Sequence, residues 1–231
     1  MKKYLFTAVF FLLIFIIISC TNQRPAYIPD VDSSVFNFEK TANININNII
    51  DTQDGIHSEA AGPDIIMPEW LRVFLYGGAG IVEMLRSYNN KYIFIAVSQG
   101  VNLAALNIWM ERFSPGQDFP VYAAERIEKK MISSTTQYPD YEYGLFFEKL
   151  VKNAFCWEYP GVNKEDSYWI KILTDNASSQ TYMAFVLLSI DRSALQNIIN
   201  DMMTQTMTEV TPTRAQTAAI NRLKQNFFTG F

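Results

Sequence analysis

The feature that most constrains the fold is an apolar run at residues 91–97, which reads Lys-Tyr-Ile-Phe-Ile-Ala-Val. Five of its seven side chains are β-branched or aromatic, and both alternating faces of a strand built from it would be apolar. A run of this kind favours a strand that is covered on both sides. We therefore predict a central β-strand at 91–97.

Two further β-rich runs, at 168–173 and 181–190, are joined by a polar segment and predict a β-hairpin over about 168–190. Helical periodicity lies between and after the strands. The expected helices span residues 103–113, 118–133, 140–155, 191–203 and 214–228. The predicted fold class is α+β, with a small, mainly antiparallel sheet packed by three to five helices.

The spacing of apolar residues also predicts which side chains form the core. On the second helix the expected stripe runs through Val121, Ala124, Ile127 and Met131. The aromatic residues at helical spacings are also expected inside: Trp109, Phe113, Phe146 and Phe155. Cys156 lies between apolar neighbours, which predicts a buried thiol that acts as a small hydrophobic group.

The first twenty residues have the form of an export signal. A basic head at Lys2 and Lys3 precedes about fifteen uncharged residues, fewer than the roughly 20 that cross a bilayer. The run closes on Ile17-Ile18-Ser19-Cys20, which resembles a bacterial lipobox. The resemblance implies that residues 1–19 are removed as a lipoprotein signal peptide and that Cys20 is acylated. An uncleaved anchor and a plain secretory leader stay open as alternatives.

Charge and composition divide the rest of the chain. Without the leader, 17 basic face 23 acidic residues, and most of the excess acid lies in residues 21–67. Proline, asparagine and scattered acids predict a flexible acidic tether over 20–66. A domain is expected at 67–206, with a helical C-terminal extension at 207–231. No basic face is large enough to suggest nucleic acid.

The order of elements resembles the LPP20 family of bacterial lipoproteins. The resemblance rests on Pro68-Glu69-Trp70-Leu71, on the strand and glycine at 92–100 and on the strand at 182–191. It covers about 68–203, but the break at 114–116 and the chain beyond Thr206 depart from it. It implies an envelope protein with a small α+β domain, and it carries over no catalytic residues.

Motifs for catalysis or metal binding are sparse, so we expect no enzyme activity, no cofactor and no metal site. The glycines at 77, 78 and 80 lack the Gly-Lys-Ser/Thr of a phosphate loop and are read as a turn or hinge. His57 is the only histidine and falls in the expected tether. Glu158, Glu165 and Asp166 cluster before the hairpin, where two acids could serve a glycosidase. In such a site we would expect a raised pKa at Glu158.

The aromatic residues of the same bend, Trp157, Tyr159 and Trp169, form the predicted partner surface. The sequence thus predicts a protein held by lipid in the cell membrane or outer membrane, outside the cytoplasm. Its domain would bind a protein partner of the envelope or support envelope structure. The alternative is a protein that binds or cleaves cell-wall glycan with the bend at 157–169.

Overall fold

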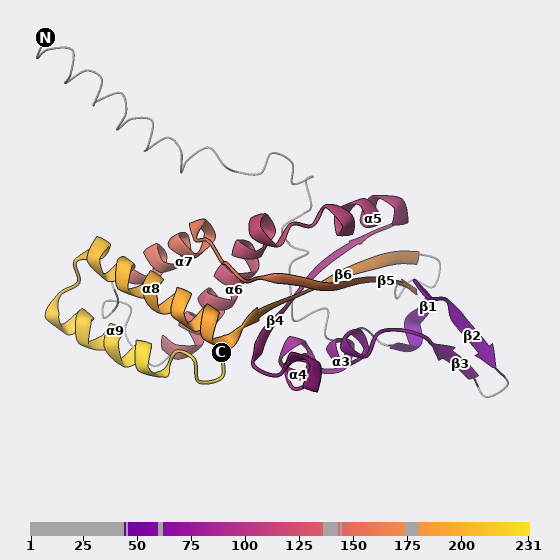
Figure 1. Ribbon diagram of the computed structural model, residues 1–231, viewed down its shortest axis with the longest axis horizontal. Coiled ribbons are helices and arrows are strands. Elements are labelled where there is room, and N and C mark those ends of the chain that lie inside the picture. The colour runs from indigo at the N-terminus through magenta and orange to yellow at the C-terminus, as the bar shows by residue number, and fades with distance from the viewer. Residues whose placement is uncertain (1–43, 45, 60–61, 136–142, 144, 174–179) are drawn as a thin grey trace, which may run out of the picture. The chain divides into compact units, whose positions relative to one another are not determined.

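The computed structural model of the protein describes residues 44, 46–59, 62–135, 143, 145–173 and 180–231, which all belong to one compact unit. Figure 1 shows its elements, which follow in this order: η2 (Ile46–Asn48), β1 (Ile49–Thr52), β2 (Ile56–Glu59), β3 (Gly62–Ile65), α3 (Glu69–Gly77), α4 (Ala79–Val82), η3 (Arg86–Tyr88), β4 (Lys91–Gly100), α5 (Leu103–Arg112), α6 (Pro115–Thr135), α7 (Phe146–Cys156), β5 (Asn163–Leu173), β6 (Gln180–Asp191), α8 (Arg192–Val210) and α9 (Arg214–Asn226).

The α+β class predicted from the sequence is confirmed. A four-stranded sheet has the order β1-β5-β6-β4, all neighbours are antiparallel, and β2 and β3 form a separate two-stranded sheet. The described residues contain seven α-helices, two more than the five expected, because α3 and α4 form over residues 69–82, where the type of 71–75 was left open and 76–80 was expected to be a loop. The central position predicted for 91–97 is wrong, since β4 is an edge strand and β6 lies between β4 and β5.

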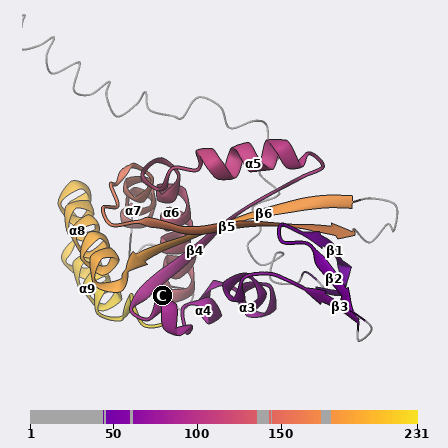
Figure 2. The ribbon, with the colours of Figure 1, turned by 45° about the vertical axis from the view of Figure 1, so that its right-hand side comes forward.

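Helices cover both faces of the sheet (Figure 2). Helix α5 lies on one face, followed by the bundle of α6 to α9 at one end, and α3 and α4 lie on the other face. We call the first interior the α5–α9 core; its largest fully buried side chains are Tyr92, Phe119, Phe146, Phe227, Ile127 and Met131. We call the second the α3 core; it includes Leu71, Phe74, Ile93, Ile95, Tyr168, Ile170 and Phe185.

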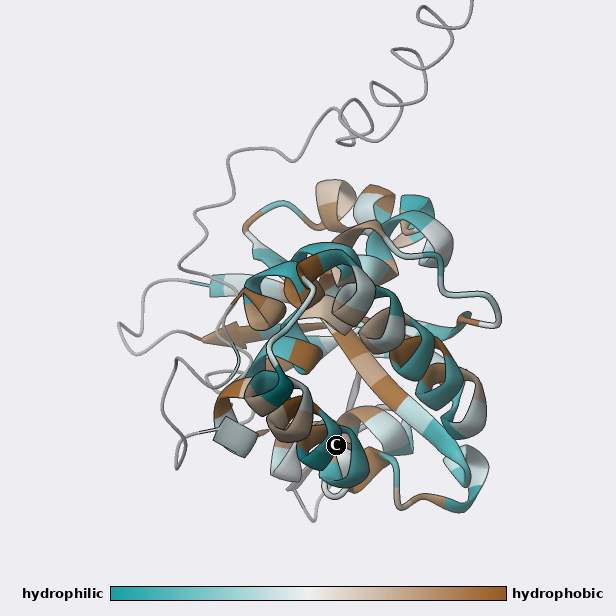
Figure 3. Cartoon of the chain, turned by 90° about the vertical axis from the view of Figure 1, so that its left-hand side faces the viewer, coloured by the Kyte–Doolittle hydropathy of each residue, from teal (hydrophilic) through white to brown (hydrophobic). Residues whose placement is uncertain are grey.

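The two cores follow from strand alternation, because successive side chains of a strand point to opposite faces. In β4, Tyr92 and Phe94 enter the α5–α9 core, whereas Ile93 and Ile95 enter the α3 core. In Figure 3 the strand at the centre of the view is mostly apolar, and the helices around it carry both apolar and polar faces. An amphipathic helix on each side is therefore what keeps this sheet out of water.

The tether predicted over 20–66 does not extend to residue 66. Strand β1 pairs with β5 in the main sheet, and Ile49 is buried in the α3 core. The hydroxyl of Thr52, also buried, lies 2.8 Å from the carbonyl oxygen of Gly55 and 3.0 Å from that of Ile66. The asparagine-rich stretch at 43–48 ends just before this strand and concealed it, because a four-residue strand is defined by burial and by pairing with β5 more than by local propensity.

The C-terminal helix is part of the domain and not an extension from it. Thr213 and Gln216 form a reciprocal capping box at the start of α9. Ala219, Ile220 and Leu223 are buried in the α5–α9 core, as is Phe227 just after the helix. The boundary predicted at 206/207 therefore falls inside α8, which continues to Val210.

Three core predictions are wrong. Val121 is 41% exposed and Phe155 is 46% exposed, and Cys156 is exposed as well. The buried face of α6 instead passes through Phe119 and Ala123, next to the correctly predicted Ala124, Ile127 and Met131. One side chain of a stripe can be misassigned because the apolar face of a helix is wide and its edges are set by the neighbours.

Glu83, directly after α4, joins elements from both layers at the β4 edge. Its side chain is 7% exposed, and its two carboxylate oxygens accept Arg126 Nη1 at 2.9 Å and Arg192 Nη2 at 2.7 Å. Glu83 Oε1 also accepts the N–H of Ile93 at 3.0 Å, and Arg126 Nη1 donates to the Ile93 carbonyl at 3.0 Å. Both outward backbone groups of Ile93 are thus satisfied, which blocks strand addition at that point of the edge.

Replacing Glu83→Gln should lower the free energy of unfolding by about 2–3 kcal/mol, because two arginines would lose their buried counter-charge. Urea denaturation at pH 7 measures this difference. Glu209→Gln is the matched control, since Glu209 forms an exposed pair with Lys149 at 3.3 Å and its change should cost less than about 1 kcal/mol. Equal effects of the two changes would contradict a structural role for Glu83.

Candidate functional site

The three aromatic residues predicted as a partner surface do not form one surface. Tyr159 is only 8% exposed, and its hydroxyl donates to the Ala154 carbonyl at 2.9 Å. Burial raises the pKa of Tyr159 well above its usual range. Trp157 and Trp169 are half-buried and both pack against the α5–α9 core. The prediction is therefore corrected at Tyr159, which is a core residue.

The acids of the bend are not brought together as a catalytic pair. Glu158 is exposed. Asp166 accepts a hydrogen bond from Trp70 Nε1 at 2.8 Å, on the α3 face of the sheet. Glu165 accepts hydrogen bonds from Lys91, at 2.6 Å, and from the Ser189 hydroxyl. These two hydrogen bonds hold the pKa of Glu165 below its ordinary value.

A cleft of about 350 Å³ lies on the opposite face of the sheet, between α5 and β5. We call it the α5–β5 cleft. Its wall on the helix side comes from Asn107, Met110 and Glu111, which are spaced three and four residues apart and so share one face of α5. The other wall comes from Lys164, Ser167 and Trp169 of β5 and from Gln53, just after β1.

A β-bulge in β5 assembles the strand side of the cleft. The pairing with β6 shifts between Lys164 and Asp166, so one extra residue is inserted there. Because of the shift, Lys164, opposite Leu188, shares a face with Trp169, opposite Ala184. Without the bulge, strict alternation would turn Lys164 towards the α3 core.

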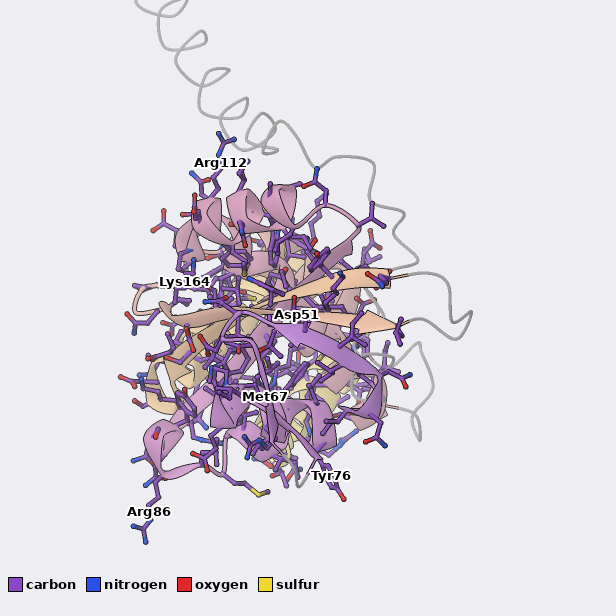
Figure 4. All side chains as sticks on the ribbon, turned by 90° about the vertical axis from the view of Figure 1, so that its right-hand side faces the viewer. Asp51, Met67, Tyr76, Arg86, Arg112 and Lys164 are labelled. Carbon is purple, nitrogen blue, oxygen red and sulfur yellow. The ribbon has the colours of Figure 1, made fainter. Side chains whose placement is uncertain are left out.

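Lys164 closes one end of the cleft by binding the end of α5. Its ammonium donates to the carbonyl oxygen of Met110 at 2.5 Å, and Met110 belongs to the last turn of the helix. Carbonyls of a last helical turn lack partners within the helix, and a cation there also complements the helix dipole. Figure 4 shows Lys164 beneath the end of α5 that Arg112 marks. This bond fixes the width of the cleft at that end.

Trp169 is held in position by its neighbour on β6. Its ring meets that of Tyr182 edge to face, with centroids 5.6 Å apart. The Lys171 ammonium lies 5.2 Å from the Tyr182 ring centroid, so the same face of β5 and β6 continues beyond Trp169 as an aromatic and cationic row. A ring packed on one side and half-exposed is oriented before any ligand arrives.

Most polar side chains of the cleft are unused within the fold. The side-chain polar atoms of Gln53, Asn107, Glu111 and Ser167, and the indole N–H of Trp169, make no hydrogen bond to another residue of the described part. Gln53 and Glu111 are exposed, and Asn107, Ser167 and Trp169 are half-buried. The arrangement can therefore offer donors and acceptors around an aromatic ring to a bound molecule.

A smaller cavity of about 180 Å³ lies between α4, the β4 edge and α6. Its lining is mostly apolar and includes Ala79, Tyr122 and Arg126. Arg126 is already bound to Glu83, and burial raises the pKa of Glu125, another residue of the lining. Because its main charged group is engaged, this cavity is the weaker candidate for a binding site.

Of the other sequence predictions, some are confirmed, some are corrected, and some fall outside the described residues. Cys20 lies outside the described residues, and His57 lies in β2 and not in a tether. The turn predicted at the glycines is confirmed at Gly78, which has a φ of 79° and separates α3 from α4. No three His, Cys, Asp or Glu side chains of the described part gather as metal ligands. Within that part, no helix has the length and apolar character to span a membrane.

Of the cleft residues, only Trp169 was among the candidate site residues predicted from the sequence. Asn107 and Glu111 carry a readable signal, since their spacing of four residues marks a polar face on an otherwise apolar helix. Lys164 and Gln53 carry none. Lys164 depends on the bulge, and Gln53 depends on the pairing of β1 with β5, where its N–H donates to the Trp169 carbonyl at 3.2 Å.

No family model, curated protein or solved structure matches this chain.

The exposure of Cys156 predicts that the folded protein reacts with a thiol reagent. In a Cys20→Ser background, Ellman's reagent should label Cys156 without denaturant and as fast as in urea, because the thiol is at the surface. Absorbance of the released thiolate follows the reaction, and a Cys156→Ser control should remain silent. Labelling that requires urea would contradict the exposure.

The lowered pKa of Glu165 predicts acid sensitivity with a defined sign. A carboxyl whose pKa is lower in the folded state stabilises the protein above its unfolded pKa, about 4.3. That stabilisation is lost as the pH falls through the folded pKa. Glu165→Gln should therefore show a smaller drop in the urea midpoint between pH 7 and pH 3 than the unchanged protein. The exposed Glu158 provides the control, and Glu158→Gln should keep the full drop.

Proposed function

We propose that this protein is a lipid-anchored lipoprotein of the bacterial envelope whose domain binds an envelope component without catalysis. Attachment is supported by the basic head, the short apolar run and the lipobox-like ending at Cys20. An acylated Cys20 would place the domain outside the cytoplasm. More than one acyl chain gives stable anchoring, because each buried CH₂ contributes about 0.8 kcal/mol.

One observation carries the binding role: beside a fixed indole ring, the α5–β5 cleft presents several polar side chains that make no hydrogen bond to another described residue. This is the usual make-up of a small binding site, in which apolar surface supplies affinity and a few polar groups supply orientation. The capping of α5 also favours a site that is formed before a ligand binds. Asn102 caps the start of this helix, and Lys164 caps its end.

Binding without catalysis is favoured by the kinds of side chain in the cleft. A glycosidase of the common type uses two carboxyl groups on either side of the scissile bond. Among the described residues, Glu111 is the only acid that lines the cleft, while Glu165 and Asp166 bond to Lys91 and Trp70 on the other face. No residue in the part of the chain that the structure describes accepts a hydrogen bond from the Ser167 hydroxyl as a catalytic base would.

The envelope component is proposed as a protein partner, as the sequence analysis has it, and a second candidate is cell-wall glycan. The second is favoured by a specific observation, since Trp169 stands among amide, hydroxyl and carboxylate side chains in one cleft. Either ligand would be met outside the cytoplasm by a domain held near the membrane surface.

Acylation is tested by growing cells with a clickable palmitate analogue. The unchanged chain should carry the label and begin at Cys20, and Cys20→Ala should lose the label and retain residues 1–19. In-gel fluorescence and mass analysis of the N-terminus are the measurements. Cys156→Ala is the matched control, because it removes the other cysteine and should keep the label. An unlabelled protein with its first residues attached would contradict the proposal.

A further inference from the structure

We infer that the α5–β5 cleft binds a neutral chain of pyranose sugars, with Trp169 stacked against a sugar ring. This inference rests on the proposed function only for where the ligand is met, and the binding itself needs no anchor. The cleft volume of about 350 Å³ falls at the small end of ligand sites, so one or two sugar rings would fill it.

The cleft combines the kinds of chemical group that bind a sugar. A pyranose has an apolar face of C–H groups and a rim of hydroxyls, and each hydroxyl both donates and accepts. Amide and hydroxyl side chains also do both, and a carboxylate accepts. Gln53, Asn107 and Ser167 supply the first kind and Glu111 the second, around the one aromatic ring of the cleft.

The charges of the cleft lining favour a neutral ligand. An anionic ligand would face Glu111, and Lys164, the one cation that the described part of the chain adds to the cleft lining, already donates to the Met110 carbonyl. A cationic ligand would meet a single carboxylate beside that ammonium. The charges of the lining therefore balance, and a neutral ligand loses the least hydration on entering.

Strand β5 restricts the binding of a peptide at the cleft. Peptides often bind by adding a strand to a sheet edge. Strand β5 is closed to such addition at residues 170–172, because β6 pairs along one side of it and β1 pairs along the other there. Next to the cleft, the Trp169 carbonyl accepts the N–H of Gln53 at 3.2 Å. A peptide at Trp169 would therefore have to bind through its side chains.

The aromatic surface at Trp169 continues beyond the cleft. Tyr182 touches Trp169 and is itself half-buried, and Lys171 lies over its ring. A second aromatic ring beside the first allows successive sugars to follow the strands, so a chain of sugars fits this face better than a single one.

The test is isothermal titration calorimetry on the full chain, purified in a detergent without a sugar headgroup. The probes are the tetrasaccharides chitotetraose, cellotetraose and maltotetraose. We expect at least one of them to bind, and Trp169→Ala to weaken that binding by about tenfold or more, equivalent to about 1.4 kcal/mol. Trp157→Ala is the matched control, a half-buried tryptophan outside the cleft lining, and should bind as the unchanged protein does.

Two further variants keep the test decisive if Trp169→Ala does not fold. Gln53 and Glu111 are exposed and carry no described partner for their side chains, so Gln53→Ala and Glu111→Gln should leave the urea midpoint unchanged and weaken sugar binding. The inference is overturned if no tetrasaccharide binds, or if binding survives these changes. Sugar binding by a chain that is not acylated at Cys20 would contradict only the proposed anchor, and acylation without sugar binding only this inference.

Discussion

Strand β6 is buried on both faces from Met183 to Ile190, and the layers of the domain follow from that burial. One face needs α3 and the other needs α5 with the bundle of α6 to α9, although these helices come from distant parts of the chain. Glu83 joins the layers at the outer edge of β4, where its carboxylate binds arginines from α6 and α8. Hydrophobic burial supplies the driving force, and this ion cluster fixes how the layers meet at the edge.

The candidate site arises from an irregularity in an otherwise regular sheet. A bulge between Lys164 and Asp166 changes which side chains of β5 face α5. Lys164 then caps the C-terminal end of α5, while the acids beside it bond on the opposite face. The same local change thus separates charges that lie next to each other in sequence, leaving one ammonium and one carboxylate in the cleft lining.

The proposed role combines attachment to a membrane with ligand binding in the α5–β5 cleft. The lipobox-like segment argues for a domain held at a membrane outside the cytoplasm, and the cleft argues for a ligand that is neutral and rich in hydroxyl groups. The two arguments are physically independent, since one rests on acyl chains at Cys20 and the other on Trp169 with its polar neighbours. A glycan ligand would make them consistent, because the envelope is where such chains occur.

The sequence by itself determined the α+β class, the hairpin and most of the buried helical faces, because local periodicity is a short-range property. It placed Trp169 among the functional residues for its size and position in the bend. Tertiary structure alone decided that Tyr159 is buried, that β4 is an edge strand and that residues 49–52 join the sheet. It also brought Gln53, Asn107 and Lys164 to one cleft. Pairing partners and a bulge set these outcomes, and both depend on residues far apart in the chain.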